Sequence, residues 1–141
     1  MTGGVPTTSV GAMPADATTI RAAIDAYTAV FTANDRDGYL GLFADDAWIE
    51  DPVGTPRHEG KEAIGVWFAD VRTRASSIEL RRTGPVRVAA GECAFPMQAR
   101  IALGDDIFVA DIIDLMTFDD DGSITSMRAF WDPAELRPAD D

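Results

Sequence analysis

The spacing of apolar residues changes character about halfway along the 141-residue chain. In the first half, one set of apolar residues recurs at the spacing of a single buried helical face: Ile20, Ile24, Tyr27 and Phe31. From residue 77 onward, apolar and polar residues alternate in segments separated by turns rich in Gly and Asp. Helices followed by a run of strands favour an α+β fold, in which three N-terminal helices pack in a curved, mostly antiparallel sheet and enclose a pocket.

Local signals place the helices more closely. We expect Thr18 or Thr19 to cap the first helix, because hydroxyl side chains satisfy the free N–H groups of a first helical turn. A second, short helix is predicted over residues 37–43. A third is predicted over residues 61–74, where apolar residues again follow a helical stripe.

The strands follow from alternation and from breaking residues. A brief strand is predicted over residues 47–51, because Pro52 stops it. The second half of the chain predicts an antiparallel meander with strands at residues 77–82, 86–90, 92–103, 107–118 and 123–131.

Length and composition indicate one domain. The chain is 46% hydrophobic and 26% charged, which is the balance of an ordinary globular protein. Residues 1–18 are rich in small and polar residues without apolar periodicity, so we expect a mobile tail there. The domain itself is expected to cover residues 19–134, followed by an acidic C-terminal tail at 135–141.

The charge balance narrows the possible partners. A net charge of −12 repels phosphate backbones and anionic lipid, so nucleic-acid partners and membrane insertion are not expected. No apolar run reaches the length of a membrane span. One cysteine, Cys93, cannot form an internal disulfide, and no secretion signal is recognisable, so we expect a cytoplasmic protein. Cys93 and the single histidine, His58, are predicted to be a buried hydrophobe and a loop residue without chemistry.

Two carboxylates stand out on the apolar segment 108–118. Asp111 and Asp114 are three residues apart, so on a strand they face opposite sides. The face of Asp114 is apolar and partly aromatic, carrying Phe108, Ala110, Ile112, Met116 and Phe118. Burial among such side chains disfavours the ionised form and raises the pKa of Asp114. Asp114 is therefore predicted to keep its proton and to donate a hydrogen bond.

Two further residues could complete a site for proton transfer. A buried Tyr27 hydroxyl would be a second neutral donor, and two donors that converge on one oxygen form an oxyanion hole. Asp51, at a strand end, could stay ionised at a pocket rim and act as a base. Each also has an ordinary structural interpretation, since an Asp before Pro is typical of turns and a Tyr on a helical stripe is typical of cores. Taken singly, they do not specify a reaction.

Longer motifs resemble a known family. The stretch 27–60, YTAVFTANDRDGYLGLFADDAWIEDPVGTPRHEG, resembles the bacterial ketosteroid isomerases of the NTF2-like, or SnoaL-like, superfamily. The segment LFADDA is shared by many members and indicates the fold, whereas EDPVG with the correctly spaced upstream Tyr is more selective. A second match consists of Asp114, Phe118, a Gly-containing turn and SMRAFW. The similarity covers about residues 15–132.

The resemblance implies a role for each of the three residues. It implies that Asp51 is the general base and that Tyr27 and protonated Asp114 form the oxyanion hole. The implied reaction moves a proton from C4 to C6 of a 3-oxo-Δ5-steroid through a dienolate, with no metal or cofactor. The resemblance and the apolar pattern also imply a homodimer and a pocket for a steroid lined by Trp67, Phe68, Met97, Ile112, Met116 and Trp131.

Departures from the family keep alternatives open. The family supports its catalytic Tyr with further Tyr hydroxyls, and the corresponding residues here are Phe43 and Phe68. Asp111 has no explanation in the family pattern. The same superfamily contains epoxide hydrolases and polyketide cyclases, which place Arg or His beside their acids, and Arg100 could supply such a charge. A protein that binds apolar ligands without turnover is the other alternative, and glycosidase chemistry by Asp51 with Asp114 is disfavoured by the apolar surroundings.

Overall fold

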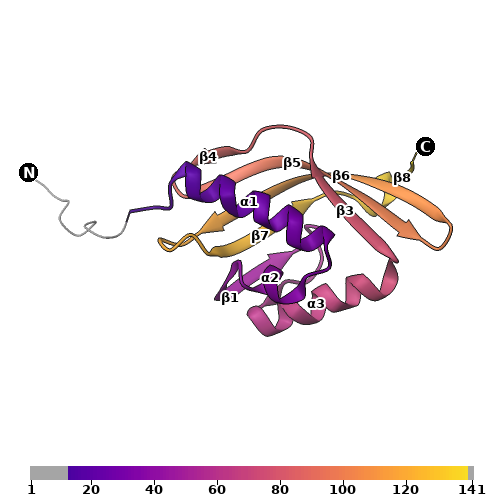
Figure 1. The fold of residues 1–141 in the computed structure, drawn as a ribbon, viewed down its shortest axis with the longest axis horizontal. Coiled ribbons are helices and arrows are strands. Elements are labelled where there is room, and N and C mark those ends of the chain that lie inside the picture. Colours follow the sequence, from indigo (N-terminus) through magenta and orange to yellow (C-terminus); the bar gives the residue numbers. More distant parts are fainter. Residues whose placement is uncertain (1–12, 140–141) are drawn as a thin grey trace, which may run out of the picture.

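A computed structural model of the chain describes residues 13–139. Helices and strands follow one another in the expected order, with the three helices before the long strands (Figure 1). The helices are α1 (Ala17–Thr32), α2 (Arg36–Leu40) and α3 (Lys61–Arg74). The strands are β1 (Phe43–Glu50), β2 (His58–Glu59), β3 (Ser77–Arg82), β4 (Arg87–Ala89), β5 (Glu92–Leu103), β6 (Asp106–Phe118), β7 (Ile124–Phe130) and β8 (Arg137–Pro138), with a 3-10 turn, η2 (Pro133–Glu135), before β8.

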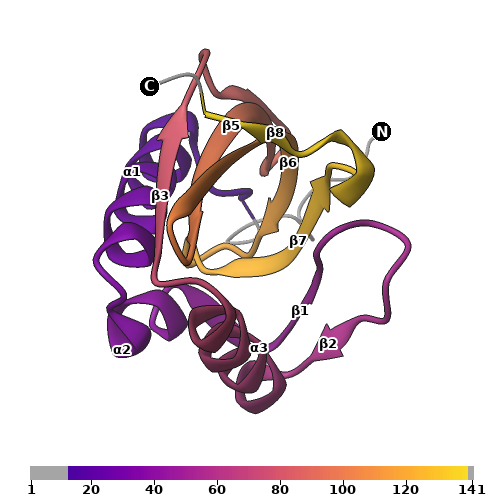
Figure 2. The same ribbon diagram turned by 90° about the vertical axis from the view of Figure 1, so that its right-hand side faces the viewer.

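One curved sheet contains all the strands. Its main order is β2-β1-β7-β6-β5-β3, with β4 paired to β5 and β8 paired to β6. Figure 2 shows the sheet curling around an interior that α1 and α3 border. Helix α1 packs against β3, and α3 packs against β1. The predicted α+β fold, with three helices in a mostly antiparallel sheet, is confirmed.

The pairing of β1 with β7 is parallel, and the antiparallel meander predicted for residues 77–131 did not include it. Ile49 lies beside Met127, and Glu50 lies beside Arg128. The Arg128 Nε–H donates to Glu50 Oε1 over 2.9 Å, so an ion pair joins the last residue of β1 to the middle of β7. Alternation along a strand says which face a residue occupies but not which strand lies next to it. Asp51, the residue after β1, is thereby held next to the C-terminal part of the chain.

The start of α1 differs from the prediction. Asp16, rather than Thr18 or Thr19, is the N-cap, and its carboxylate accepts a hydrogen bond of 2.8 Å from the Thr19 N–H. The helix thus begins at Ala17, and both threonines lie in its first turn. Ala15, within the expected tail, is buried against the core. Residues 1–12 of that expected tail lie outside the described residues.

The boundary between α2 and β1 also differs. The prediction of helix through residue 43 was wrong, because α2 ends at Leu40 and β1 already begins at Phe43. The Ile124 N–H donates to the Leu42 carbonyl over 2.8 Å, and Phe43 then pairs with Ile124. A hydrogen bond from the far end of the chain therefore decides where this helix gives way to strand. Asp51 lies one residue beyond β1 rather than within it.

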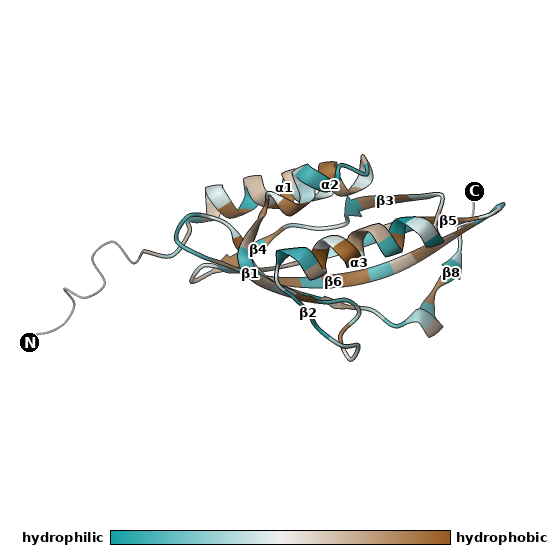
Figure 3. Ribbon diagram, turned by 90° about the horizontal axis from the view of Figure 1, so that it is seen from below, coloured by the Kyte–Doolittle hydropathy of each residue, from teal (hydrophilic) through white to brown (hydrophobic). Residues whose placement is uncertain are grey.

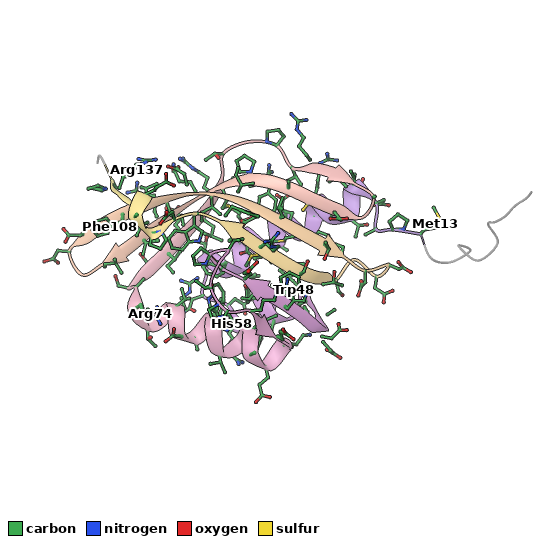
Figure 4. All side chains as sticks on the ribbon, turned by 180° about the vertical axis from the view of Figure 1, so that it is seen from behind. Met13, Trp48, His58, Arg74, Phe108 and Arg137 are labelled. Atoms are coloured by element: carbon green, nitrogen blue, oxygen red, sulfur yellow. The ribbon has the colours of Figure 1, made fainter. Side chains whose placement is uncertain are left out.

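The expected acidic tail is partly built into the sheet. Residues 137–138 form β8, and Arg137 lies opposite Val109 of β6. Arg137 also donates to the Asp111 carboxylate, with its Nε at 3.2 Å, while Gln98 donates to the same carboxylate from β5. Figure 4 shows Arg137 and Phe108 together, at the end of the molecule opposite Met13. Asp111, unexplained by the family pattern, thus helps to hold β8 beside β6 by accepting hydrogen bonds from Arg137.

The core lies between the helices and the concave face of the sheet. Apolar and polar residues alternate along α1 and α3 in Figure 3, as expected for helices with one buried side. The largest fully buried side chains include Tyr39, Phe43, Phe68, Phe95, Met97 and Met116. No helix within residues 13–139 is long and apolar enough to cross a membrane.

The capping interaction gives a first test of the structure. Replacing Asp16 with Ala removes the acceptor for the Thr19 N–H, so we expect the Tm to fall by about 3 to 5 °C at pH 7. The hydrogen bonds to Thr19 lower the pKa of Asp16, so its stabilising effect is present above the usual carboxyl pKa. That effect is lost as the pH falls through the lowered value.

Thermal unfolding followed by circular dichroism measures the change. Thr18→Ala is the matched control, because the Thr18 side chain is exposed in the same turn and makes no capping bond. A larger loss of Tm in Thr18→Ala than in Asp16→Ala would contradict the assignment.

Candidate active site

A cavity of about 460 Å³ lies between the helices and the concave face of the sheet. Cavities of several hundred Å³ with mainly apolar walls are typical of small-molecule sites. Helices α1 and α3, the segment after β1, and strands β3, β5 and β6 contribute to its walls. Three of the lining side chains are the predicted site residues Tyr27, Asp51 and Asp114.

Asp114 lies on the concave face of β6 and is only 3% exposed. Its neighbours across the sheet are Phe95 of β5 and Ala129 of β7, both buried and apolar. Burial is the main cause that raises the pKa of Asp114 well above its usual range, and the charge of Asp51 raises it further. Burial therefore favours the protonated form of the Asp114 carboxyl, which can donate a hydrogen bond into the cavity.

Asp51 is held at the cavity by the residue before it and by a tryptophan. The Glu50–Arg128 ion pair fixes the end of β1, so the side chain of Asp51 follows at a defined place. The Trp131 indole N–H donates to Asp51 Oδ1 over 2.7 Å. Burial raises the pKa of Asp51 to about 6, while the bond from Trp131 lowers it. The carboxyl is thus mostly ionised at neutral pH, yet more basic than an exposed Asp.

The segment after Asp51 turns sharply back toward the sheet. Pro52 follows a cis peptide bond, and its carbonyl accepts hydrogen bonds from the N–H and the hydroxyl of Thr55. Gly54 has a φ of 102°, a conformation that glycine adopts without steric cost. The Val53 N–H donates to the Ala129 carbonyl over 2.8 Å, which ties this turn to β7. The EDPVG motif therefore encodes the geometry of the turn as well as the carboxyl.

Tyr27 points inward from α1 because it shares the buried stripe predicted for that helix. The side chain is 3% exposed, and its ring packs against Phe31 and Tyr39. Burial, followed by the charges that Tyr39, Asp114 and Asp51 would carry when ionised, raises the pKa of the Tyr27 hydroxyl well above its usual value. Tyr27 is therefore a neutral donor at any physiological pH.

The three groups complement one another. Burial raises the pKa of all three groups, and the charge of Asp51 further raises the pKa of both Asp114 and Tyr27. One ionisable carboxyl with a pKa near 6 faces the same cavity as two uncharged O–H donors. Such a set can remove a proton from carbon beside a carbonyl and stabilise the resulting enolate oxygen.

The expected apolar wall is present only in part. Trp67, Met97, Ile112 and Trp131 line the cavity. Phe68 and Met116 do not line it, and both belong to the buried core. Helical and strand spacing places a residue on the inward side, but it does not distinguish the cavity surface from the layer behind it.

The two residues predicted to be inert differ from each other. Cys93 is buried, and burial raises the pKa of its thiol to about 12, as a structural cysteine requires. His58, predicted to lie in a loop, instead pairs with Ile49 as part of β2 and lines the cavity. Its ring lies 6.4 Å from that of Trp67. Figure 4 shows His58 and Arg74 on the α3 side of the molecule, and both contribute polar groups to the cavity.

No group of three or more His, Cys, Asp or Glu side chains in the described range 13–139 is placed to hold a metal ion. At the cavity, Arg74 forms an exposed i,i+4 ion pair with Asp70 over 2.6 Å.

Comparison with known proteins identifies the family. A family model described as a SnoaL-like domain matches residues 24–127, which is most of the chain. The chain belongs to the SnoaL-like family. The NTF2-like resemblance stated from the sequence motifs is thereby confirmed.

Individual relatives agree with this assignment. A curated "Steroid Delta-isomerase" from Nocardioides simplex is 38% identical to this SnoaL-like protein over 117 residues, covering 83% of this chain and 93% of the relative. The crystal structure of RV0760c from Mycobacterium tuberculosis has a TM-score of 0.79 at 22% identity, covering 89% of this chain and 99% of that one. The second likeness concerns the fold alone.

Sequence reasoning missed two parts of this SnoaL-like site. The bond from Trp131 to Asp51 joins residues 80 positions apart, and no local pattern links them. Tyr39 lies against Tyr27, although the spacing of α1 and α2 alone does not indicate their contact. The sequence did contain one signal that Tyr39 is buried. Asp35 caps a helix of five residues, and Tyr39, four residues after the cap, is the one residue of that helix that is buried.

The hydrogen bond from Trp131 to Asp51 gives the second prediction. Replacing Trp131 with Phe removes the N–H that favours the ionised carboxyl, so we expect the pKa of Asp51 to rise above its value of about 6. A titration of the Asp51 carboxyl carbon by NMR measures this value. Trp48→Phe is the control, because Trp48 stacks on Arg57 and does not line the cavity. An unchanged pKa in Trp131→Phe would show that the indole does not stabilise the carboxylate.

Proposed function

We propose that this protein is a steroid Δ-isomerase that moves the double bond of a 3-oxo-Δ5-steroid into conjugation. The observation that carries the proposal is the combination in one apolar cavity of an ionisable Asp51 with the neutral donors Tyr27 and Asp114. The 38% identity to a steroid Δ-isomerase supports an isomerase function in general. The cavity volume of about 460 Å³ suits a rigid, flat and apolar ligand.

In the proposed mechanism, the ionised Asp51 removes a proton from C4 of the bound steroid. The electrons of the C4–H bond form the C3–C4 double bond, and the carbonyl electrons move onto O3 to give a dienolate. The O–H groups of Tyr27 and Asp114 donate to O3 as its negative charge develops. Asp51 then returns the proton to C6, which restores the carbonyl and leaves the C4–C5 double bond.

The pKa values suit this division of roles. A base works best when its pKa lies near the working pH, because it is then both ionised and basic. Burial raises the pKa of Asp51 to about 6, which brings it near neutral pH. Deeper burial and the neighbouring charge of Asp51 keep the proton on Asp114. One apolar cavity thus makes one carboxyl a base and the other a hydrogen-bond donor.

The alternatives have less support. An epoxide hydrolase or polyketide cyclase would place a cation beside Asp114, but Arg100 lies on the opposite face of the sheet, since it alternates with the inward residues Met97, Ala99 and Ile101. His58 lines the cavity and keeps a histidine-dependent cyclase under consideration. A protein that binds an apolar ligand without turnover has the same cavity, and activity separates it from the isomerase.

Conversion of 5-androstene-3,17-dione to its conjugated isomer, followed by ultraviolet absorbance, tests the proposal. We expect Asp51→Asn to lower kcat by about 10²- to 10⁴-fold, because the base is lost. Tyr27→Phe is expected to lower kcat by about 10²- to 10³-fold. Asp114→Asn and Asp114→Ala form a matched pair: Asn retains an N–H donor, so its loss of kcat is expected to be the smaller.

The pH dependence has a defined sign. Because Asp51 must be ionised, kcat/KM is expected to fall tenfold for each pH unit below about 6 and to level off above it. Equally slow conversion by the wild type and Asp51→Asn would contradict the isomerase proposal. Binding of the steroid without conversion would then favour the non-catalytic alternative.

We propose that the protein is a cytoplasmic homodimer. The outer face of β6 and β7 carries exposed apolar side chains, with Ile113 at 47%, Leu115 at 36% and Phe130 at 38% exposure. Ile113 and Phe130 are paired across the two strands, so these residues form one patch. Contiguous apolar patches of this kind mark association surfaces, and a second copy would cover the patch with an identical surface.

Sedimentation equilibrium tests the dimer. The wild type is expected to sediment at about twice the chain mass of 15.1 kDa. Leu115→Lys places a charge in the patch and is expected to give a folded monomer. Val66→Lys is the control, because Val66 is 65% exposed on α3, away from the outer sheet face. A monomeric wild type would exclude the dimer.

A further inference from the structure

The hydroxyl of Tyr39 is buried without a hydrogen-bond partner. The side chain is 0% exposed, and its oxygen meets no partner in hydrogen-bond geometry among the described residues. Buried hydroxyls are nearly always paired, because the lost hydration of an unpaired group destabilises the fold. A phenylalanine would fill the same space without that cost. The hydroxyl of Tyr39 therefore calls for a functional explanation.

The surroundings of Tyr39 leave one possible acceptor among the rings that it contacts. The ring packs on five aromatic residues, namely Tyr27, Phe31, Phe43, Trp67 and Phe68. Three of these are phenylalanines, and the indole N–H of Trp67 is a donor only. The hydroxyl of Tyr27 is the one oxygen in this set, and the two tyrosine rings lie 5.7 Å apart.

The two hydroxyls already influence each other. Burial raises the pKa of Tyr39 well above its usual value, and the charges of Asp51 and Asp114 raise it further, while the nearby Tyr27 hydroxyl opposes this rise. Tyr39 therefore keeps its proton and remains a donor. The two rings lie 5.7 Å apart, and the hydroxyls are near enough for each to affect the ionisation of the other.

Helix α2 brings this hydroxyl to the site. Asp35 caps α2 through the Gly38 N–H over 2.9 Å, and Gly38 lies close to Val30 of α1, so that an added Cβ would meet that side chain at 3.0 Å. On this helix, the ring of Tyr39 lies against that of Tyr27. The positions of the family's supporting tyrosines, Phe43 and Phe68, lie 5.0 and 4.7 Å from the Tyr39 ring. The ring of Tyr39 thus contacts both phenylalanines.

We infer that Tyr39 is a positioning residue that donates its O–H to the oxygen of Tyr27 while Tyr27 donates to the substrate oxygen. Tyr39 does not line the cavity, so it acts only through Tyr27. As negative charge develops on the substrate, Tyr27 shares its proton and its own oxygen becomes more negative. A donor behind that oxygen strengthens with the charge, because linked hydrogen bonds polarise one another. This inference rests on the proposed isomerase function.

The test is Tyr39→Phe, for which activity and stability should change in different directions. We expect kcat for 5-androstene-3,17-dione to fall by about 5- to 20-fold with little change in KM, since a hydrogen bond to a charged group is lost. The Tm is expected to stay the same or rise, because an unpaired buried hydroxyl is removed. An unchanged kcat in an active wild type would overturn the inference, as would a loss of kcat that follows a loss of Tm.

A double substitution shows whether Tyr39 acts through Tyr27. In the Tyr27→Phe background, Tyr39→Phe is expected to cause no further loss of kcat, because the acceptor is already absent. Independent losses that multiply would contradict the inference. Thr28→Ala is the matched control, since it removes a neighbouring hydroxyl on α1 that bonds only to the helix backbone. It is expected to leave kcat unchanged.

A binding measurement separates this inference from the isomerase proposal. 4-Nitrophenolate presents an anionic oxygen to the donors, and its absorbance distinguishes it from 4-nitrophenol. We expect Tyr39→Phe to weaken its binding by about 5- to 20-fold, even if the wild type converts no steroid. Failure of the wild type both to convert the steroid and to bind the phenolate would overturn both proposals. Binding by the wild type with equal affinity in Tyr39→Phe would overturn this inference alone.

Discussion

Two carboxyls face one apolar cavity, and burial there makes it costly for both to carry charge. Asp114, enclosed by β5, β6 and β7, meets this constraint by holding its proton. Asp51 is half-buried, receives the indole N–H of Trp131, and ionises near pH 6. The difference between the two residues is therefore one of position, since the chemical group is the same. The roles proposed for the two carboxyls depend on burial, on the indole bond to Asp51 and on the charge that Asp51 places near Asp114.

The fold creates this difference through its curvature. A concave sheet gives inward residues such as Asp114 an enclosure that a flat sheet could not provide, and α1 closes it with Tyr27. The parallel contact of β1 with β7 then brings Asp51 to the open side of the same cavity. Asp111, three residues before Asp114, points the other way and instead anchors β8. Because side chains alternate along β6, Asp114 faces the cavity while Asp111 holds β8 from the other face of the strand.

Local patterns were sufficient for some of these features and not for others. The period-two alternation of β6 assigned Asp114 to the apolar face, and the stripe of α1 turned Tyr27 inward, because both depend only on neighbours in sequence. The α2–β1 boundary, the Trp131 bond and the contact of Tyr39 with Tyr27 depend on partners from other elements, which periodicity does not specify. The N-cap was misplaced by two or three residues because Asp16 and the two threonines carry similar capping signals. Periodicity also did not show that Phe68 and Met116, which both face inward, lie in the core without lining the cavity.

The parallel pairing of β1 with β7 also bears on how the protein folds. The contacts that fix residues 50 and 51 join partners 78 and 80 positions away, so a large loop must close before they form. Closing such loops costs entropy before the contacts can compensate for it, and chains rich in distant pairings fold slowly. During synthesis, the segment carrying the base is made long before the strand that holds it. The cavity that holds Asp51 and Asp114 is therefore complete only when nearly the whole chain is available.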